Sequence, residues 1–342
     1  MATTDTPSLR KALVIGCTNY RQHAAIRTIG EGAKAVAEQL RTNYDGTRNF
    51  DVQLLTDQGT NKPPYENEDE LMGIIEAFLS GGRPTETGVF YFIGHGMGDR
   101  LFDEASLWFC GSEQMTYDIE IKMQWLLERI QKSQFGNIFV LLDCCYSGSF
   151  GATLEEPLRD GVCILTACSA DQPAVGWMKE HYTQYSLFTG FVKEALQGRA
   201  ADPITGVISF SSVYNYVSQN LGGKQAPVLR CNVSRYVPLK QHRVSYDNEI
   251  LEVIHSLFLL NDTDQWPEGS GWRRAYTRRY ILGPKDEERF NRSLPFLLRQ
   301  GFVIEKLGTN NFSPVPQPFY MLTSKGRRLW DMVELEYYSS QS

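Results

Sequence analysis

Short apolar runs, separated by stretches with helical spacing, constrain the fold of this chain more than any other feature. The runs are continuous rather than alternating, which is typical of strands that are buried on both faces of a parallel sheet. The predicted strands are 11–17, 50–57, 87–96, 137–145 and 161–170, and the predicted helices between and after them are 31–44, 66–82, 118–132, 186–198 and 209–221. Strands that alternate with helices predict an α/β domain of three layers, with a mainly parallel sheet between two layers of helices.

The pattern changes after about residue 235. There it predicts helices over 248–260 and 285–301, the second interrupted by Pro295, then a hairpin of 302–308 and 319–323 with a long Pro/Asn-rich tip, then a last helix from 324. Helices followed by a hairpin are typical of winged-helix proteins. We therefore expect a first domain over residues 8–235 and a small winged-helix-like α+β domain over 245–338.

Composition excludes several classes of protein. The net charge is −6, which argues against a polycation that binds nucleic acid. The second domain is itself near neutral, with 12 Lys/Arg and 13 Asp/Glu from 245 to 342. No apolar stretch reaches the roughly 18 residues of a membrane span, and the N-terminus lacks the apolar core of a signal peptide. We expect a cytoplasmic protein with reduced thiols and no membrane partner.

The seven cysteines raise the question of what the adjacent pair Cys144 and Cys145 does. No two cysteines form a CxxC pair, and the five histidines show no HxxxH spacing. Cys163 and Cys168 are separated by four residues, but no second pair of cysteines with a similar spacing could complete a four-ligand site. A closed zinc site is therefore not expected, and no metal ligand is assigned. The open alternatives are buried filler, a redox pair or a nucleophile.

Two predicted strand ends carry reactive groups. The third strand ends at Gly94, His95 and Gly96, and the fourth ends at Asp143, Cys144 and Cys145. Functional groups gather at the carboxyl ends of parallel strands. A cysteine attacks as its thiolate, so it needs a nearby base, and its oxyanion needs backbone N–H donors. The 50 residues from His95 to Cys145 match the spacing that caspases show.

Several ordered blocks extend this match. "ALVIGCTNY", "VFYFIGHGMGD", "FVLLDCCYSG", "TACSADQPA", "SLFTGFVKEAL" and "ISFSSVYNYV" resemble metacaspase-like caspase-fold peptidases over residues 8–235. The resemblance implies cleavage of protein substrates by a His/Cys dyad, with no cofactor in the chemistry and with calcium activation left open. It makes His95 the general base and acid and Cys145 the nucleophile. The backbone amides of Gly96 and Cys145 become the oxyanion donors, and Cys144 becomes a neighbour.

Substrate preference follows from charge. Asp143 occupies the position at which metacaspases place an acid in the pocket for the residue before the scissile bond, and Asp171 is a second candidate. A carboxylate there favours Arg or Lys. The alternative for Asp143 is an acid that caps nearby amides. Where many metacaspases carry Asn-Asp this chain has Glu31-Gly32, and Ile93 replaces their serine before Gly-His-Gly, which weakens the pocket assignment but not the dyad.

Three functions remain open. The favoured hypothesis is a cysteine endopeptidase that cleaves after Arg or Lys and that a protein partner regulates through the C-terminal domain, by analogy in defence (such as antiviral defence) or cell death. The second is a catalytically silent caspase-fold adaptor that acts through the same domain. The third is a dithiol redox sensor at Cys144 and Cys145. The remaining histidines are expected to be surface or packing residues, namely His23, His181, His242 and His255.

Overall fold

The computed structural model divides into two compact units, Met1–Arg243 and Val244–Ser342. Within them it describes residues 10–23, 28–60, 62–99, 104–150, 157–169, 185–202, 205–222, 225–234, 237–243, 250, 253–254, 284–310 and 313–330. No helix in this described part is long and apolar enough to cross a membrane.

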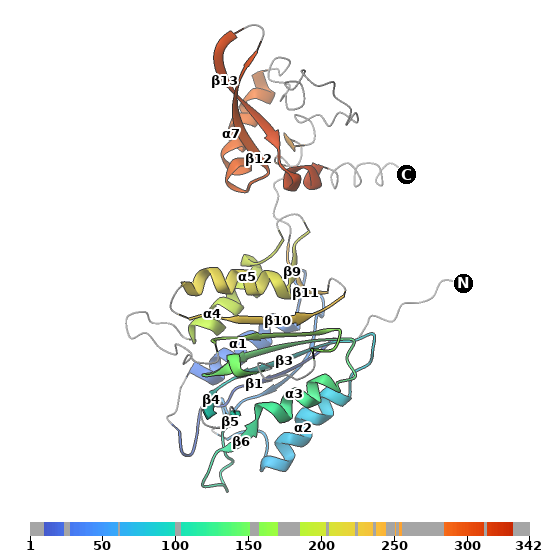
Figure 1. The fold of residues 1–342 in the computed structure, drawn as a ribbon, viewed down its shortest axis with the longest axis vertical. Helices are drawn as coiled ribbons and strands as arrows, with labels where there is room; N and C mark the ends of the chain where they lie inside the picture. The colour runs from blue at the N-terminus through green and yellow to red at the C-terminus, as the bar shows by residue number, and fades with distance from the viewer. Residues whose placement is uncertain are drawn as a thin grey trace, which may run out of the picture. The chain divides into compact units, whose positions relative to one another are not determined.

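The first unit is built on a six-stranded sheet in the order β10-β8-β7-β3-β1-β2 (Figure 1). Five of its strands are parallel and correspond to the five predicted ones, so the prediction of a mainly parallel sheet is confirmed. The sixth, β10, was not predicted and pairs antiparallel with β8. The strands are β1 (Arg10–Ile15), β2 (Asp51–Leu55), β3 (Thr87–Ile93), β7 (Asn137–Asp143), β8 (Val162–Thr166) and β10 (Val228–Asn232).

Helices cover both faces of this sheet, as Figure 1 shows. Side chains alternate across each strand, so Leu13 and Ile15 enter one core while Ala12 and Val14 enter the other. The first core lies under α2 (Glu68–Ser80) and α3 (Met123–Gln131), and the second under α1 (Thr28–Arg41), α4 (Leu187–Glu194) and α5 (Phe210–Leu221). The predicted three-layer α/β arrangement is confirmed.

The chain departs from the expected elements around the third strand. The predicted strand 87–96 divides, because β3 ends at Ile93 and β4 (His95–Asp99) begins a separate antiparallel sheet with β5 (Glu104–Phe109) and β6 (Ile119–Lys122). The predicted helix 118–132 is wrong in its first turn, which is β6. There the buried Ile119 and Ile121 alternate with the exposed Glu120 and Lys122, a period of two that belongs to a strand.

Smaller elements complete the first unit. The helix predicted over 186–198 ends as α4 at Glu194 and continues as a π-helix, η2 (Ala195–Arg199). The predicted helix 209–221 is α5, which begins with a capping box of Ser209 and Ser212. Strands β9 (Val207–Ser209) and β11 (Pro238–Gln241) form an antiparallel pair that was not predicted.

The second unit contains α7 (Pro284–Arg299), the antiparallel strands β12 (Val303–Asn310) and β13 (Ser313–Leu322), and a helix over 324–330. The predicted interruption at Pro295 is wrong, since α7 continues through it. The prediction of a long tip is also wrong, because both strands extend into the Pro/Asn-rich segment. Proline is compatible with an edge strand. Most of the predicted helix 248–260 lies outside the described residues.

Cys163 and Cys231 are joined by a disulfide, which differs from the expected set of reduced thiols. They lie directly opposite each other on the antiparallel strands β8 and β10, with Cα atoms 4.1 Å apart. The sequence did not indicate this pair because the pairing of β10 with β8 joins residues 68 positions apart. The other five cysteines are not joined in a disulfide.

This pairing predicts the thiol chemistry of the protein. Alkylation after unfolding without a reductant should label Cys17, Cys110, Cys144, Cys145 and Cys168 and leave a linked peptide pair that contains Cys163 and Cys231. Peptide mapping by mass spectrometry measures this directly, and Cys231→Ser, which frees Cys163, is the matched control. Full labelling of both cysteines in the unreduced wild type would contradict the pairing.

Candidate active site

The two predicted catalytic residues lie just beyond the carboxyl ends of the neighbouring strands β3 and β7. The parallel register pairs Ile93 with Asp143, and the N–H of Gly94 donates to the carbonyl of Asp143 at 3.1 Å. His95 and Cys145 each follow two residues after this register pair. The sequence-predicted groups therefore leave the sheet side by side, at the edge where sites in parallel sheets form.

Gly96 shows how closely the two segments approach each other. A Cβ atom on Gly96 would lie 2.2 Å from the carbonyl oxygen of Cys145 and 3.0 Å from the Sγ of Cys144. Real Cβ atoms do not come so near a backbone oxygen, so only glycine fits at this position. The backbone that follows His95 is thus in direct contact with the turn that carries Cys145.

The turn after Cys145 has an unusual backbone. Tyr146 has a φ of 55°, in the left-handed region, and it begins a short 3-10 helix, η1 (Ser147–Ser149). A non-glycine residue keeps this conformation only when its surroundings enforce it. Ser147 is fully buried, and its hydroxyl accepts from the N–H of Cys168 at 3.4 Å. On the far side, Arg230 of β10 donates to the carbonyls of Gly148 and Phe150.

The two adjacent cysteines have different environments. The side chain of Cys144 is buried, with 1% exposure, and burial raises the pKa of its thiol well above the usual value. Cys145 is half-buried. A reactive cysteine must reach solvent and its substrate as a thiolate. The structure therefore favours Cys145 over Cys144 as the reactive thiol of the pair.

Aromatic contacts surround His95. The ring of Tyr20 lies 4.6 Å from that of His95 in an edge-on arrangement. The Tyr20 hydroxyl accepts from the backbone N–H of His95 at 3.1 Å and donates to the carbonyl of Trp108 at 2.9 Å. Burial raises the pKa of Tyr20, so its phenol stays protonated and can donate. Trp108 is also the partner of His95 in the β4–β5 ladder.

Asp143 is buried at the end of β7, beneath the start of α4. The hydroxyls of Ser186, which caps α4, and of Thr189 donate to its Oδ2. Burial raises the pKa of the Asp143 carboxyl, and the two hydroxyl donors offset only part of that effect. Among the residues that the structure describes, Asp143 has no cationic partner. Asp171 lies outside the described residues.

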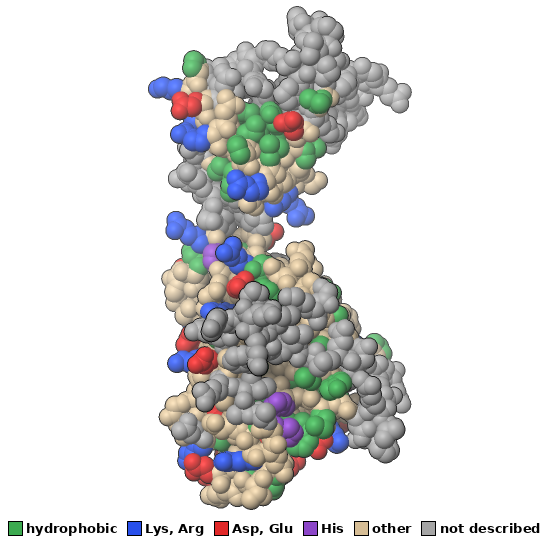
Figure 2. Space-filling model, turned by 90° about the vertical axis from the view of Figure 1, so that its left-hand side faces the viewer, with side chains coloured by type: hydrophobic (Ala, Val, Ile, Leu, Met, Phe, Trp, Pro, Cys, Tyr) green, Lys and Arg blue, Asp and Glu red, His purple; other side chains and the backbone are tan. Residues whose placement is uncertain are grey.

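His23, which we expected to be a surface or packing residue, packs beside His95. His23 lies at the site, with its ring 5.3 Å from that of His95 and its Nδ1 2.8 Å from Oδ2 of Asp118. Figure 2 shows histidine side chains, in purple, next to each other on one face of the first unit. The position of His23 in the loop after a parallel strand was the signal that could have found it. His242 follows β11, while His181 and His255 lie outside the described residues.

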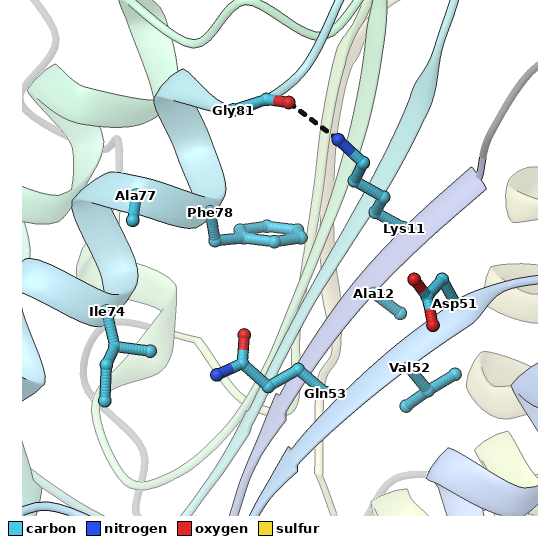
Figure 3. A pocket seen from close by; sticks show the side chains of 9 residues that line it. All are labelled: Lys11, Ala12, Asp51, Val52, Gln53, Ile74, Ala77, Phe78 and Gly81. Carbon is cyan, nitrogen blue, oxygen red and sulfur yellow. Dashed lines mark hydrogen bonds between the residues drawn. The ribbon is translucent and has the colours of Figure 1, made fainter.

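Elsewhere the described chain has a hollow but no cluster of metal-ligating side chains. No group of three or more His, Cys, Asp or Glu side chains among the described residues could hold a metal ion. A hollow of about 450 Å³ lies between α2 and the first residues of β1 and β2, at the opposite end of the strands from Cys145 (Figure 3). It contains none of the predicted site residues. Its lining is Lys11, Ala12, Asp51, Val52, Gln53, Ile74, Ala77, Phe78 and Gly81.

Comparison with protein families agrees with this geometry. The family model for the caspase domain matches residues 9–238, which include both β3 and β7. A search of curated proteins found no significant match. The family match supports a cysteine peptidase with protein substrates.

Proposed function

Because the chain belongs to the caspase-domain family, we propose that it is a cysteine endopeptidase of the metacaspase type, with His95 and Cys145 as its dyad. The observation that carries the proposal is the juxtaposition of the two strand ends, in which the Gly94–Gly96 segment contacts the nucleophile turn. Thiol catalysis needs an accessible thiol near a base, and here a half-buried thiol lies on a constrained turn that contacts the segment carrying His95.

In this mechanism His95 takes the proton of Cys145, and the thiolate attacks the carbonyl carbon of the substrate. The backbone N–H groups of Gly96 and Cys145 donate to the oxyanion that forms. His95 then protonates the leaving amine, and the acyl group stays on the sulfur of Cys145. A water molecule, deprotonated by His95, hydrolyses the thioester and restores the enzyme. No cofactor takes part in these steps, and calcium activation stays a prediction.

The preference for Arg or Lys before the scissile bond rests on Asp143. This carboxyl is buried two residues before Cys145, receives two hydroxyl donors and has no cationic partner in the described residues. A buried carboxylate without a counter-charge is costly, and a guanidinium or ammonium group from the substrate would compensate for it. The N-terminus of α4 adds a partial positive charge that favours the ionised form of Asp143 before the substrate binds.

The test is hydrolysis of fluorogenic peptides that end in Arg, Lys or Asp, with and without calcium. Replacing Asp143 with asparagine preserves the shape of the side chain and removes its charge. We expect Asp143→Asn to lower kcat/KM for Arg and Lys peptides about 100-fold, consistent with the loss of one desolvated ion pair. Asp51→Asn, at an exposed position on β2, should have no effect.

The outcomes separate the two interpretations of Asp143. An unchanged preference in Asp143→Asn, combined with a lower melting temperature, would show that the acid only anchors α4. Cleavage after Asp alone would keep the dyad and overturn the basic pocket. No cleavage after any of the three residues, together with an unreactive Cys145, would favour the catalytically silent adaptor.

We assign the second unit a regulatory role in this proposal, as a winged-helix-like domain that binds a protein partner. Its hairpin exposes two aliphatic side chains on β12, Ile304 at 41% and Leu307 at 67%. Exposed aliphatic groups on a near-neutral module suit a protein surface better than a nucleic acid. A regulated protease of this kind is consistent with a role in defence or cell death.

A further inference from the structure

His23 and Asp118 form a hydrogen bond that the hydrolysis mechanism above does not use. The Nδ1 of His23 lies 2.8 Å from Oδ2 of Asp118. The imidazole ring lies 5.3 Å from that of His95 and 4.6 Å from the nearer ring of Trp108. Because the side chain of His23 is only 20% exposed, its ring is packed within the site rather than in solvent.

Asp118 fixes the orientation of this ring. Its carboxylate is fully buried and accepts the backbone N–H groups of Arg21, Gln22, His23 and Gly111. Burial acts to raise the pKa of Asp118, but these donors outweigh it and lower the pKa, so the group is ionised. An ionised carboxylate can only accept, so Nδ1 of His23 is the donor in their hydrogen bond.

The segment that carries His23 is held at both ends by buried acids. Asp57 accepts the N–H groups of Thr18 and Asn19, while Asp118 accepts those of residues 21–23. Two rings of this segment contact His95, since Tyr20 lies 4.6 Å and His23 5.3 Å from it between ring centres. The loop after β1 therefore presents two oriented rings to the imidazole of the dyad.

We infer that His23 is a positioning residue, which holds the imidazole of His95 in the orientation needed for proton transfer. The inference rests on the proposed function. His95 must face the thiol in the first step and the leaving amine in the next, and small errors in such geometry reduce catalysis strongly. A residue that acts in this way should change kcat and leave KM unchanged, because it does not touch the pocket of Asp143.

Three variants separate this role from a structural one. Asparagine places its amide nitrogen near the position of Nδ1, so His23→Asn keeps the bond to Asp118 but removes the ring. His23→Phe keeps a ring against His95 and cannot donate to Asp118. We expect a 10- to 100-fold lower kcat in His23→Asn, with KM and the melting temperature unchanged, and a smaller loss in His23→Phe. His242→Asn, at the end of β11, is the matched control.

A second readout does not need turnover. Alkylation of Cys145 by iodoacetamide, located by mass spectrometry, reports how well His95 activates the thiol. It should slow in parallel with kcat in His23→Asn and stay near the wild-type rate in His242→Asn. The inference is overturned if kcat and the alkylation rate of Cys145 in His23→Asn equal those of wild type. It is also overturned if these two rates fall in His23→Phe alone. If the wild type hydrolyses no peptide, the proposed function fails, and the alkylation rates alone decide the role of His23.

Discussion

Replacing Cys145 with alanine should abolish peptide hydrolysis, lowering kcat/KM by about 10⁴-fold or more. In the proposed mechanism the thiol of Cys145 bonds to the substrate, so His95 has no nucleophile to activate without it. The fold should survive, because Cys145 is half-buried and the removed atom leaves little empty space in the core. Fluorogenic peptides that end in Arg or Lys measure the loss, and circular dichroism checks the fold.

Cys144 supplies the matched control for this prediction. Cys144→Ser changes a buried neighbour that burial keeps in the thiol form, so the peptidase should tolerate it with most of its activity. A redox sensor built on the adjacent pair would behave differently, because either substitution would remove its response to oxidation. If activity survives in Cys145→Ala and disappears in Cys144→Ser, Cys145 is not the nucleophile and the proposed dyad is contradicted.

Gly96→Ala should lower kcat about 100-fold, because the nucleophile turn must move to admit one methyl group. The added Cβ would lie 2.2 Å from the carbonyl oxygen of Cys145, and backbone atoms cannot rotate away as a side chain can. The shift displaces both the sulfur and the N–H groups that we assign to the oxyanion. Steady-state kinetics with an Arg peptide measure this, and the alkylation rate of Cys145 reports whether the thiol has lost its base.

Gly98→Ala separates this effect from a general cost of adding a methyl group to β4. There the new Cβ would meet the side chain of Tyr146 at 3.2 Å, and a side chain can give by a few tenths of an ångström. We expect its activity to remain within about threefold of wild type, since no backbone atom of the nucleophile turn has to move. Equal losses in both variants would show that the close approach at Gly96 has no special part in catalysis.

Much of the fold was predictable because its causes are local. A strand buried on both faces needs a continuous apolar run, and an amphipathic helix needs a 3.6-residue spacing, so the layers of the first unit followed from the sequence. The wrong element boundaries lie where a strand with a two-residue repeat adjoins a helix with a 3.6-residue repeat, or where a strand ends early. Ile119 and Ile121 belong to a short strand that continues directly into α3, and a helical pattern read across the junction concealed it. At Ile93 the strand ended early because the next residues join another sheet.

The sequence by itself determined the proposed dyad and the place where it lies. His95 and Cys145 follow apolar strands, and parallel strands end at the same edge of a sheet, so two local patterns were enough to bring them together. Tertiary structure alone decided what surrounds them. The contact of His23 with Asp118 joins residues 95 positions apart, and those of Asp143 with Ser186 and Thr189 join residues 43 and 46 apart. No local period encodes such distances, because packing sets them only after the layers have formed.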